Sequence, residues 1–190
     1  NVLRDLWHGK RVTHQGSFTA ADAKLFSLPP KPAPIYVAAL TPETARWGGG
    51  WADGLITVAT PAAPVAEVVS AFRKAGGADK PVHLQVKLSY ARDESTALAG
   101  ALDQWRPNAL PAQQTEDLRT IDAFERAARR IGEEDIRQAV HVGADIDAHV
   151  RTLQRYMALD IAALHLHNVN RQQAEFIDAF GQHVLPALER

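Results

Sequence analysis

The sequence predicts an α/β fold with a parallel sheet, made of four strand–helix units, which is the number in half of a (β/α)8 barrel. Short apolar runs that fit buried strands alternate along the chain with segments of helical periodicity. Strands that alternate with helices in this way pair in parallel through right-handed crossovers. The length of 190 residues fits one domain.

The expected elements follow from periodicity, capping residues and helix breakers. A first helix ends at Gly9, an extended excursion covers residues 11–28, and the prolines of residues 29–34 exclude a helix interior there. We expect strands at residues 35–39, 55–59, 83–90 and 161–169. We expect helices at residues 42–48, 64–74, 94–105, 117–131, 147–158 and 172–188, a loop at 107–111 and a short extended piece at 141–143.

Composition limits the possible partners. The chain has 21 basic and 22 acidic residues and a formal net charge of −1, which gives no electrostatic reason to expect a nucleic acid or an anionic membrane. It has no cysteine, so disulfides and thiol catalysis are excluded. An ordinary cytoplasmic enzyme fits this composition. Residues 1–4 have helical character without a signal peptide, and we therefore expect a partial domain cut from a longer chain.

The turn after the first predicted barrel strand is the best candidate site. It comprises Ala39, Leu40, Thr41 and the following residues up to Thr44. A strand that leads into a helix N-terminus presents free backbone amides and the positive end of a helix dipole, which suit a phosphate group. The alternative is that Thr41 and Pro42 only form a well-made helix start.

Two histidines lie two residues apart on the last predicted strand. His165 and His167 therefore share one face of it, and His167 and Asn168 lie nearer its carboxyl end, where barrel sites are built. Three interpretations stay open: hydrogen-bonded histidines that line the barrel, a substrate pocket, or a metal pair that still lacks its further ligands. Trp47, Trp51 and Trp105 are interpreted as packing residues.

Several short motifs follow one another in a recognisable order. They are residues 6–9 (LWHG), 12–16 (VTHQG), 34–39 (PIYVAA), 52–56 (ADGLI) and 164–167 (LHLH). Their order and spacing resemble the C-terminal part of the luciferase-like monooxygenase superfamily. Within it, the branch with the greatest similarity contains deazaflavin-dependent sugar-phosphate dehydrogenases.

This resemblance implies that the chain holds strands five to eight of a (β/α)8 barrel. It also implies a dissociable cofactor, either FMN or the deazaflavin coenzyme F420, whose tail would contact Ala39, Leu40, Thr41 and Thr44. His167 and Asn168 would line the substrate pocket. The main catalytic histidine of the family belongs to the first four strands, so no residue of this chain is assigned that role.

The chain also departs from the dehydrogenase branch. Leu40 and Thr41 stand where that branch has two glycines, and Glu43 adds a negative charge in the first helical turn. Residues 60–64 contain no basic residue and Gln138 stands where a second base is expected, which argues against a sugar-phosphate substrate.

The sequence therefore predicts a flavin- or deazaflavin-dependent oxidoreductase that acts on a small organic substrate, by hydride transfer or monooxygenation, and is inactive as this piece alone. A homodimer is expected. The alternatives are a metal-dependent barrel hydrolase that uses His165 and His167, and a non-catalytic half-barrel that dimerises to cover its open strand edges.

Overall fold

The computed structural model describes residues 1–189, which divide into two compact units with the boundary after Ile35. The first unit contains helix α1 (Val2–Trp7) and an antiparallel hairpin of β1 (Val12–Gln15) and β2 (Thr19–Ala23). Every residue of this unit is at least partly exposed. No helix among residues 1–189 is both long and apolar enough to cross a membrane.

The second unit is built on a five-stranded sheet in which every paired neighbour is parallel. Its strands are β3 (Tyr36–Ala38), β4 (Gly54–Ala59), β5 (Val82–Tyr90), β6 (His141–Gly143) and β7 (Ala163–Asn168). β5 is central, because β4 and β6 pair with successive parts of it and β7 pairs with it from His83 to Leu88. The parallel α/β prediction is confirmed, and the described strands form an open sheet instead of a closed barrel.

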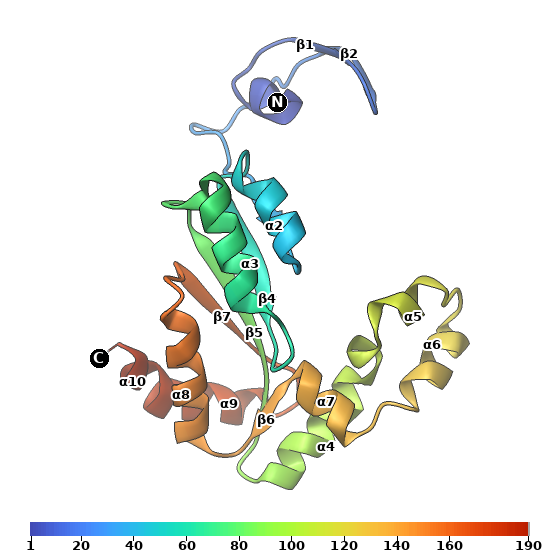
Figure 1. Cartoon of the computed structure of the whole chain (residues 1–190), viewed down its shortest axis with the longest axis vertical. Coiled ribbons are helices and arrows are strands. Elements are labelled where there is room, and N and C mark those ends of the chain that lie inside the picture. Colours follow the sequence, from blue (N-terminus) through green and yellow to red (C-terminus); the bar gives the residue numbers. More distant parts are fainter. Residues whose placement is uncertain (190) are drawn as a thin grey trace. The chain divides into compact units, whose positions relative to one another are not determined.

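Helices follow the strands in the expected alternation (Figure 1). They are α2 (Pro42–Gly49), α3 (Val65–Phe72), α4 (Glu94–Trp105), α5 (Ala112–Glu116), α6 (Ile121–Ala128), α7 (Glu133–Ala139), α8 (Ile146–Met157), α9 (Gln173–Ala179) and α10 (Leu185–Leu188). Single helical turns cover Arg73–Gly77, Arg106–Ala109 and Phe180–Val184.

One face of the sheet carries the main core. Alternate residues of β5 are fully buried, and they pack with residues of α2, α3 and α8 and of the Phe180–Val184 turn. The predicted apolar stripe of α3 is wholly buried in this cluster. Its members are Val65, Val68, Val69 and Phe72. Burial of apolar area on this face is the main source of stability for the unit.

The other face of the sheet is polar and partly open. The residues of β5 that point there are His83, Gln85 and Lys87, and the register places Ile56 and Val58 of β4 and His165 and His167 of β7 beside them. Ile56 is 43% exposed although it lies in the middle of a strand. In a closed barrel this face would line the interior.

Three sequence predictions differ from the structure. The expected helix at 117–131 is shorter, because Thr120 caps a new helix at Ile121, and α5 and α7 were not predicted. Trp47 and Trp51 are not core residues: they are 65% and 40% exposed and contact each other at 4.9 Å between ring centroids.

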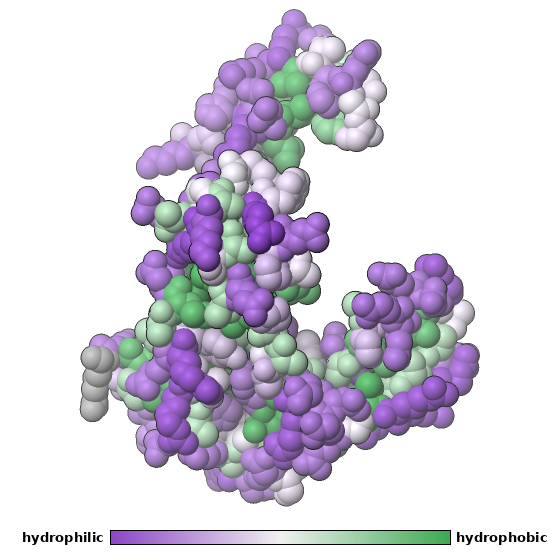
Figure 2. Space-filling view, viewed as in Figure 1, coloured by the Kyte–Doolittle hydropathy of each residue, from purple (hydrophilic) through white to green (hydrophobic). Residues whose placement is uncertain are grey.

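Figure 2 shows hydrophilic side chains over much of the visible surface, with apolar patches between them.

Arg73 ties the end of α3 to the turn before β7. Its guanidinium donates hydrogen bonds to four carbonyl oxygens, and it is largely buried. The acceptors belong to Gly77, Ala78, Lys80 and Asp160. Because Asp160 has a positive φ of 57°, this clamp also holds an unfavourable backbone conformation in place.

We expect Arg73→Ala to lower the free energy of unfolding by about 2–3 kcal/mol, because several charge-assisted hydrogen bonds are lost together. Urea denaturation measures the change. Lys74→Ala is the matched control, since Lys74 is exposed and adjacent, and it should change stability by less than about 0.5 kcal/mol. Equal effects of the two substitutions would contradict the clamp.

Candidate functional site

The candidate site lies at the carboxyl edge of the sheet. Because β3, β4, β5 and β7 pair in parallel, their carboxyl ends meet at one edge. Helix α2 starts directly after β3 at this edge. Ligands of α/β sheets and barrels bind at the carboxyl ends of the strands, so the side chains and amides here are the candidates for binding.

The turn between β3 and α2 is a capped helix start, as predicted. The hydroxyl oxygen of Thr41 accepts a hydrogen bond from the Thr44 amide at 3.3 Å and donates one to the Thr44 hydroxyl at 3.1 Å. Pro42 occupies the first helical position, where its missing amide proton costs nothing. The cap orients both hydroxyls toward each other at the helix start.

The same turn leaves backbone donors open. The amides of Leu40, Thr41 and Glu43 have no hydrogen-bond partner within residues 1–189. Ala39 is buried and its amide donates to the Ile56 carbonyl, whereas the Leu40 side chain is 67% exposed. The open amides fit the acceptor oxygens of a cofactor tail, although the Glu43 carboxylate opposes an anion there.

A second group of candidates lies on the open face of the sheet. Lys87 of β5 and His167 of β7 are register partners, and Nζ of Lys87 lies 3.0 Å from Nδ1 of His167. The same Nζ lies 4.9 Å from the ring centroid of Trp105, which places the ammonium over the indole. The Trp105 and His167 rings meet edge to face at 5.2 Å. Trp105, interpreted from sequence as a packing residue, is thus part of a polar cluster.

The protonation of this cluster follows from its chemistry. An ammonium group can only donate, so Nδ1 of His167 accepts and the imidazole proton resides on Nε2. Burial lowers the pKa of Lys87. Burial, and then the charge of Lys87, lower the pKa of His167. The lowered pKa of His167 favours the neutral imidazole, whose Nδ1 can accept from Lys87.

The cluster borders a pocket of about 500 Å³ at the carboxyl ends of β4 and β5. Side chains of β4, β5, α4 and α7 and of the loops that follow β4 and α4 form its wall. The lining residues are Val58, Thr60, Ala62, Lys87, Trp105, Asn108, Ala109, Asp135, Gln138 and Ala139.

Asn168, predicted beside His167, faces the other way. Its side chain accepts a hydrogen bond from the Tyr90 amide at 3.0 Å and donates one to Asn170 at 3.1 Å. Asn170 in turn donates to Ser89 and to the Tyr90 carbonyl. Because these groups are buried and mutually bonded, Asn168 joins β7 to β5 instead of pointing into the pocket.

His165 shares the open face with His167 but contacts a different side chain. Its Nε2 lies 3.1 Å from Nδ1 of His83, and the two rings stack. Within residues 1–189 no group of three or more His, Cys, Asp or Glu side chains is placed to hold a metal ion. Since His165 contacts another histidine and His167 contacts an ammonium, the structure does not favour the metal-dependent hydrolase alternative.

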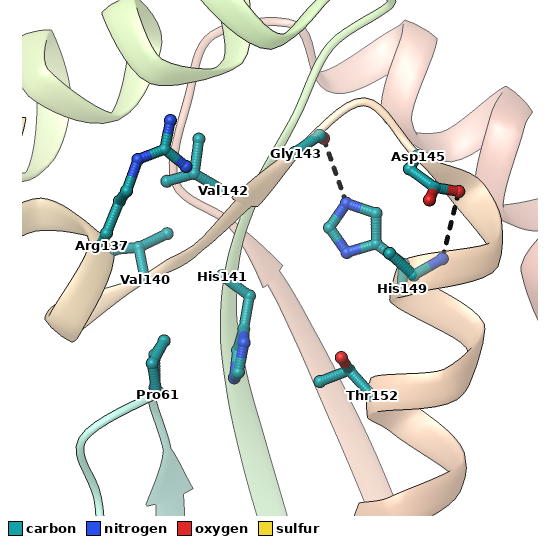
Figure 3. Close-up of a pocket in the computed structure, with 10 residues that line it drawn as sticks. Pro61, Arg137, Val140, His141, Val142, Gly143, Asp145, His149 and Thr152 are labelled. Atoms are coloured by element: carbon teal, nitrogen blue, oxygen red, sulfur yellow. Dashed lines mark hydrogen bonds between the residues drawn. The ribbon is translucent and has the colours of Figure 1, made fainter.

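A smaller cavity of about 200 Å³ lies beside β6 and α8 (Figure 3). Its two histidines already have partners: His141 contacts the Tyr156 hydroxyl at 2.8 Å and His149 contacts the Gly143 carbonyl at 3.1 Å. Burial lowers the pKa of His149 and lowers that of His141 to about 4. These contacts stabilise the connection between β6 and α8. The cavity beside them is therefore the weaker candidate for a ligand site.

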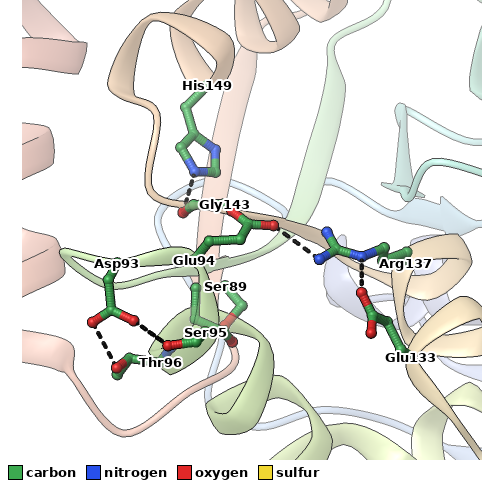
Figure 4. A network of polar contacts seen from close by, with 10 residues as sticks. Ser89, Asp93, Glu94, Ser95, Thr96, Glu133, Arg137, Gly143 and His149 are labelled. Carbon is green, nitrogen blue, oxygen red and sulfur yellow. Dashed lines mark hydrogen bonds and ion pairs between the residues drawn. The ribbon is translucent and has the colours of Figure 1, made fainter.

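An ion-pair network fixes the elements around the carboxyl edge (Figure 4). Arg137 of α7 pairs with Glu94 of α4 and with Glu133, each at 2.9 Å. Asp93 caps α4 by accepting from Thr96, and hydrogen bonds from Ser95 and Thr96 lower its pKa to about 2. The Glu94–Arg137 pair joins the start of α4 to α7, which carries one wall of the pocket.

Sequence reasoning missed Lys87 and Trp105. The signal for Lys87 was present, because His83, Gln85 and Lys87 alternate with buried residues in β5. No periodicity predicts Trp105, since its position depends on how the end of α4 returns to the sheet.

Comparison with known proteins identifies the family. The sequence profile of the luciferase-like monooxygenases matches residues 1–162. The chain belongs to this family. Structures of luciferase-like proteins share its fold: an F420-dependent secondary alcohol dehydrogenase superposes with a TM-score of 0.80 at 24% identity, over 97% of this chain and 58% of that protein.

Relatives of this luciferase-like chain include two dehydrogenases. The F420-dependent glucose-6-phosphate dehydrogenase of Microbacterium testaceum is 30% identical and aligns with all of the chain and 59% of its own length. That of Intrasporangium calvum is 30% identical over 98% of the chain and 58% of its own length. An FMN-bound type II Baeyer–Villiger monooxygenase from Pseudomonas putida superposes with a TM-score of 0.61 at 12% identity, over 97% of the chain and 60% of that protein. The chain thus spans somewhat over half the length of these relatives.

We expect Lys87→Met to raise the pKa of His167 toward its ordinary value, because a neighbouring positive charge is removed while part of the burial remains. NMR titration of the His167 ring protons measures this shift. Lys74→Met, which removes an exposed charge on another element, should leave it unchanged. A lower pKa of His167 in Lys87→Met would contradict the arrangement.

We also expect the free energy of unfolding to fall as the pH drops below about 6.5, because His141 binds a proton in the unfolded chain but resists it in the folded one until about pH 4. Urea denaturation at several pH values measures the slope. His141→Gln removes the titration, so its slope between these limits should be shallower. An unchanged slope would show that His141 is not held neutral.

Proposed function

We propose that the protein is a luciferase-like oxidoreductase that uses dissociable FMN or F420 and acts on a small organic substrate. The observation that carries the proposal is that a turn with open amides and the Lys87–His167–Trp105 cluster belong to one parallel sheet and lie toward the carboxyl ends of its strands. The F420-dependent and FMN-bound relatives support this assignment.

In this proposal β3, β4, β5 and β7 are strands five to eight of a (β/α)8 barrel, within one partial domain of residues 1–190. The polar character of the open sheet face supports this arrangement, because the face carries histidine and lysine side chains. A sheet face on the outside of a barrel would instead be covered by helices or would carry small polar residues in contact with water. The remaining strands would close the barrel over this face. A cytoplasmic location remains a prediction.

The turn would hold the tail of the cofactor. The amides of Leu40 and Thr41 would bind its acceptor oxygens, the Thr44 hydroxyl would add a donor, and buried Ala39 would fix the end of β3. His167 would contact the substrate, and Asn168 would support it from the opposite face of β7. The bound cofactor supplies the redox chemistry, hydride transfer or oxygen activation, while this chain binds and orients.

We expect residues 1–190 alone to bind the cofactor weakly and to be inactive, because the open face lacks the other half of a barrel pocket. A fluorescence titration with FMN and with F420, and a turnover assay, measure this. Turnover by this chain alone would contradict the proposal.

We expect Glu43→Gln to strengthen binding of the anionic cofactor about two- to fivefold, because a negative charge leaves the N-terminus of α2, where such a charge is worth about 0.3–1 kcal/mol. The same titration measures it. Glu67→Gln is the matched control, since Glu67 occupies the first turn of α3. Binding that is unchanged in Glu43→Gln, or that changes equally in both variants, would place the anion elsewhere.

We propose a homodimer as well. The exposed Trp47–Trp51 pair supports it, because two adjacent aromatic side chains on the surface offer apolar area that a second copy can cover. Light scattering in solution should give twice the mass of one chain. A stable monomer would contradict the dimer and also the non-catalytic dimerising half-barrel.

A further inference from the structure

The pocket beside Lys87 contains almost no net charge. Its only charged lining residues are Lys87 and Asp135, one positive and one negative. The carboxylate of Asp135 accepts a hydrogen bond from the Gly132 amide at 2.9 Å and caps α7. The other two residues of α7 that line the pocket, Gln138 and Ala139, are uncharged.

These charges are unsuited to a phosphate ester. Phosphate sites usually provide several charge-assisted donors, often arginine forks. This pocket has one cation, Lys87, and one carboxylate, Asp135, so the sum of their charges is zero. The amide nitrogen of Gln138 donates to Glu134. The loop of residues 60–64, which follows β4 into the pocket, has no lysine or arginine. A dianion would meet the Asp135 carboxylate without a second cation in the pocket to compensate it.

The same groups suit an uncharged oxygen next to an apolar body. The ammonium of Lys87 has three donors, of which one goes to His167, and no carboxylate pairs with it among residues 1–189. Trp105 provides a large flat surface beside it, and Val58, Ala62 and Ala109 add apolar wall. A hydroxyl or carbonyl oxygen can accept from the ammonium while its carbon skeleton lies against the indole.

We propose that this pocket selects an uncharged alcohol or ketone, with its oxygen bound by Lys87 and its apolar part against Trp105, and that it excludes phosphate esters. This inference rests on the proposed function, because it assigns the substrate class of that enzyme. It separates the chain from the glucose-6-phosphate dehydrogenases that it resembles in sequence.

NMR spectroscopy of the 190-residue chain tests the proposal. The probes are cyclohexanone, cyclohexanol, glucose 6-phosphate and inorganic phosphate, each titrated over the same concentration range. We expect the two neutral compounds to shift the Trp105 indole and His167 ring signals, and the two phosphates to leave both signals unchanged. Lys87→Met should weaken binding of the neutral compounds about tenfold, which corresponds to the loss of one charge-assisted hydrogen bond, while Lys74→Met should not.

Two results would overturn the inference. One is a shift of the Trp105 and His167 signals by the phosphates at lower concentration than by the neutral compounds. The other is no response to the neutral compounds, or a response that persists in Lys87→Met. The first result is decided in the unmodified protein, by comparing the concentrations at which phosphates and neutral compounds shift the two signals, so it does not depend on whether the variant folds. A cofactor titration on the same sample is independent, so failure of cofactor binding with retained ketone binding would reject the proposed function and not this inference.

Discussion

The alternation of side chains along β5 is the constraint on which the rest of the second unit depends. Every second residue from Val82 to Leu88 enters the core with α3 and α8, and the residues between them, His83 to Lys87, face the open side. A shift of one residue in register would bury a lysine among valines and leucines and expose the core. The apolar core therefore fixes Lys87 on the side where the cluster forms.

Parallel pairing converts this alternation into a site. β7 pairs with β5 in the register that sets His167 beside Lys87, and Asn168 locks that register from the other face through Tyr90 and Asn170. The residue that was predicted to line the pocket thus positions its neighbour. The same parallel direction points the end of β3, and so the start of α2 with its open amides, toward the carboxyl side of the sheet, with Ala38 opposite Ile56 of β4.

Much of the fold could be predicted from sequence, because local signals agree with the tertiary structure. Thr41 and Pro42 start α2, the stripe from Val65 to Phe72 is buried, and the strands lie close to their expected positions. The segment after Trp105 could not be predicted in detail, since its short helices depend on caps such as Thr120 and on a small separate core around Ile136.

The site was harder to predict than the fold for a physical reason. A polar residue in a strand indicates which face it occupies, but not its partner on a strand about 80 positions away, as for Lys87 and His167. The burial of tryptophans was also predicted wrongly. Tryptophan side chains are usually buried to a large extent, yet Trp47 and Trp51 contact each other on the surface. Only the assembled sheet shows which aromatic residue, Trp105, reaches the cation.

The central claim is that the cofactor and substrate meet this chain at the carboxyl edge of the sheet and on its open face. Mapping of amide chemical shifts on addition of F420 or FMN tests it most directly. The account predicts shifts confined to Leu40, Thr41 and Glu43 and to the strand residues around Lys87 and His167. Shifts centred instead on the cavity between His141 and Thr152, or on the helix-covered face alone, would contradict it.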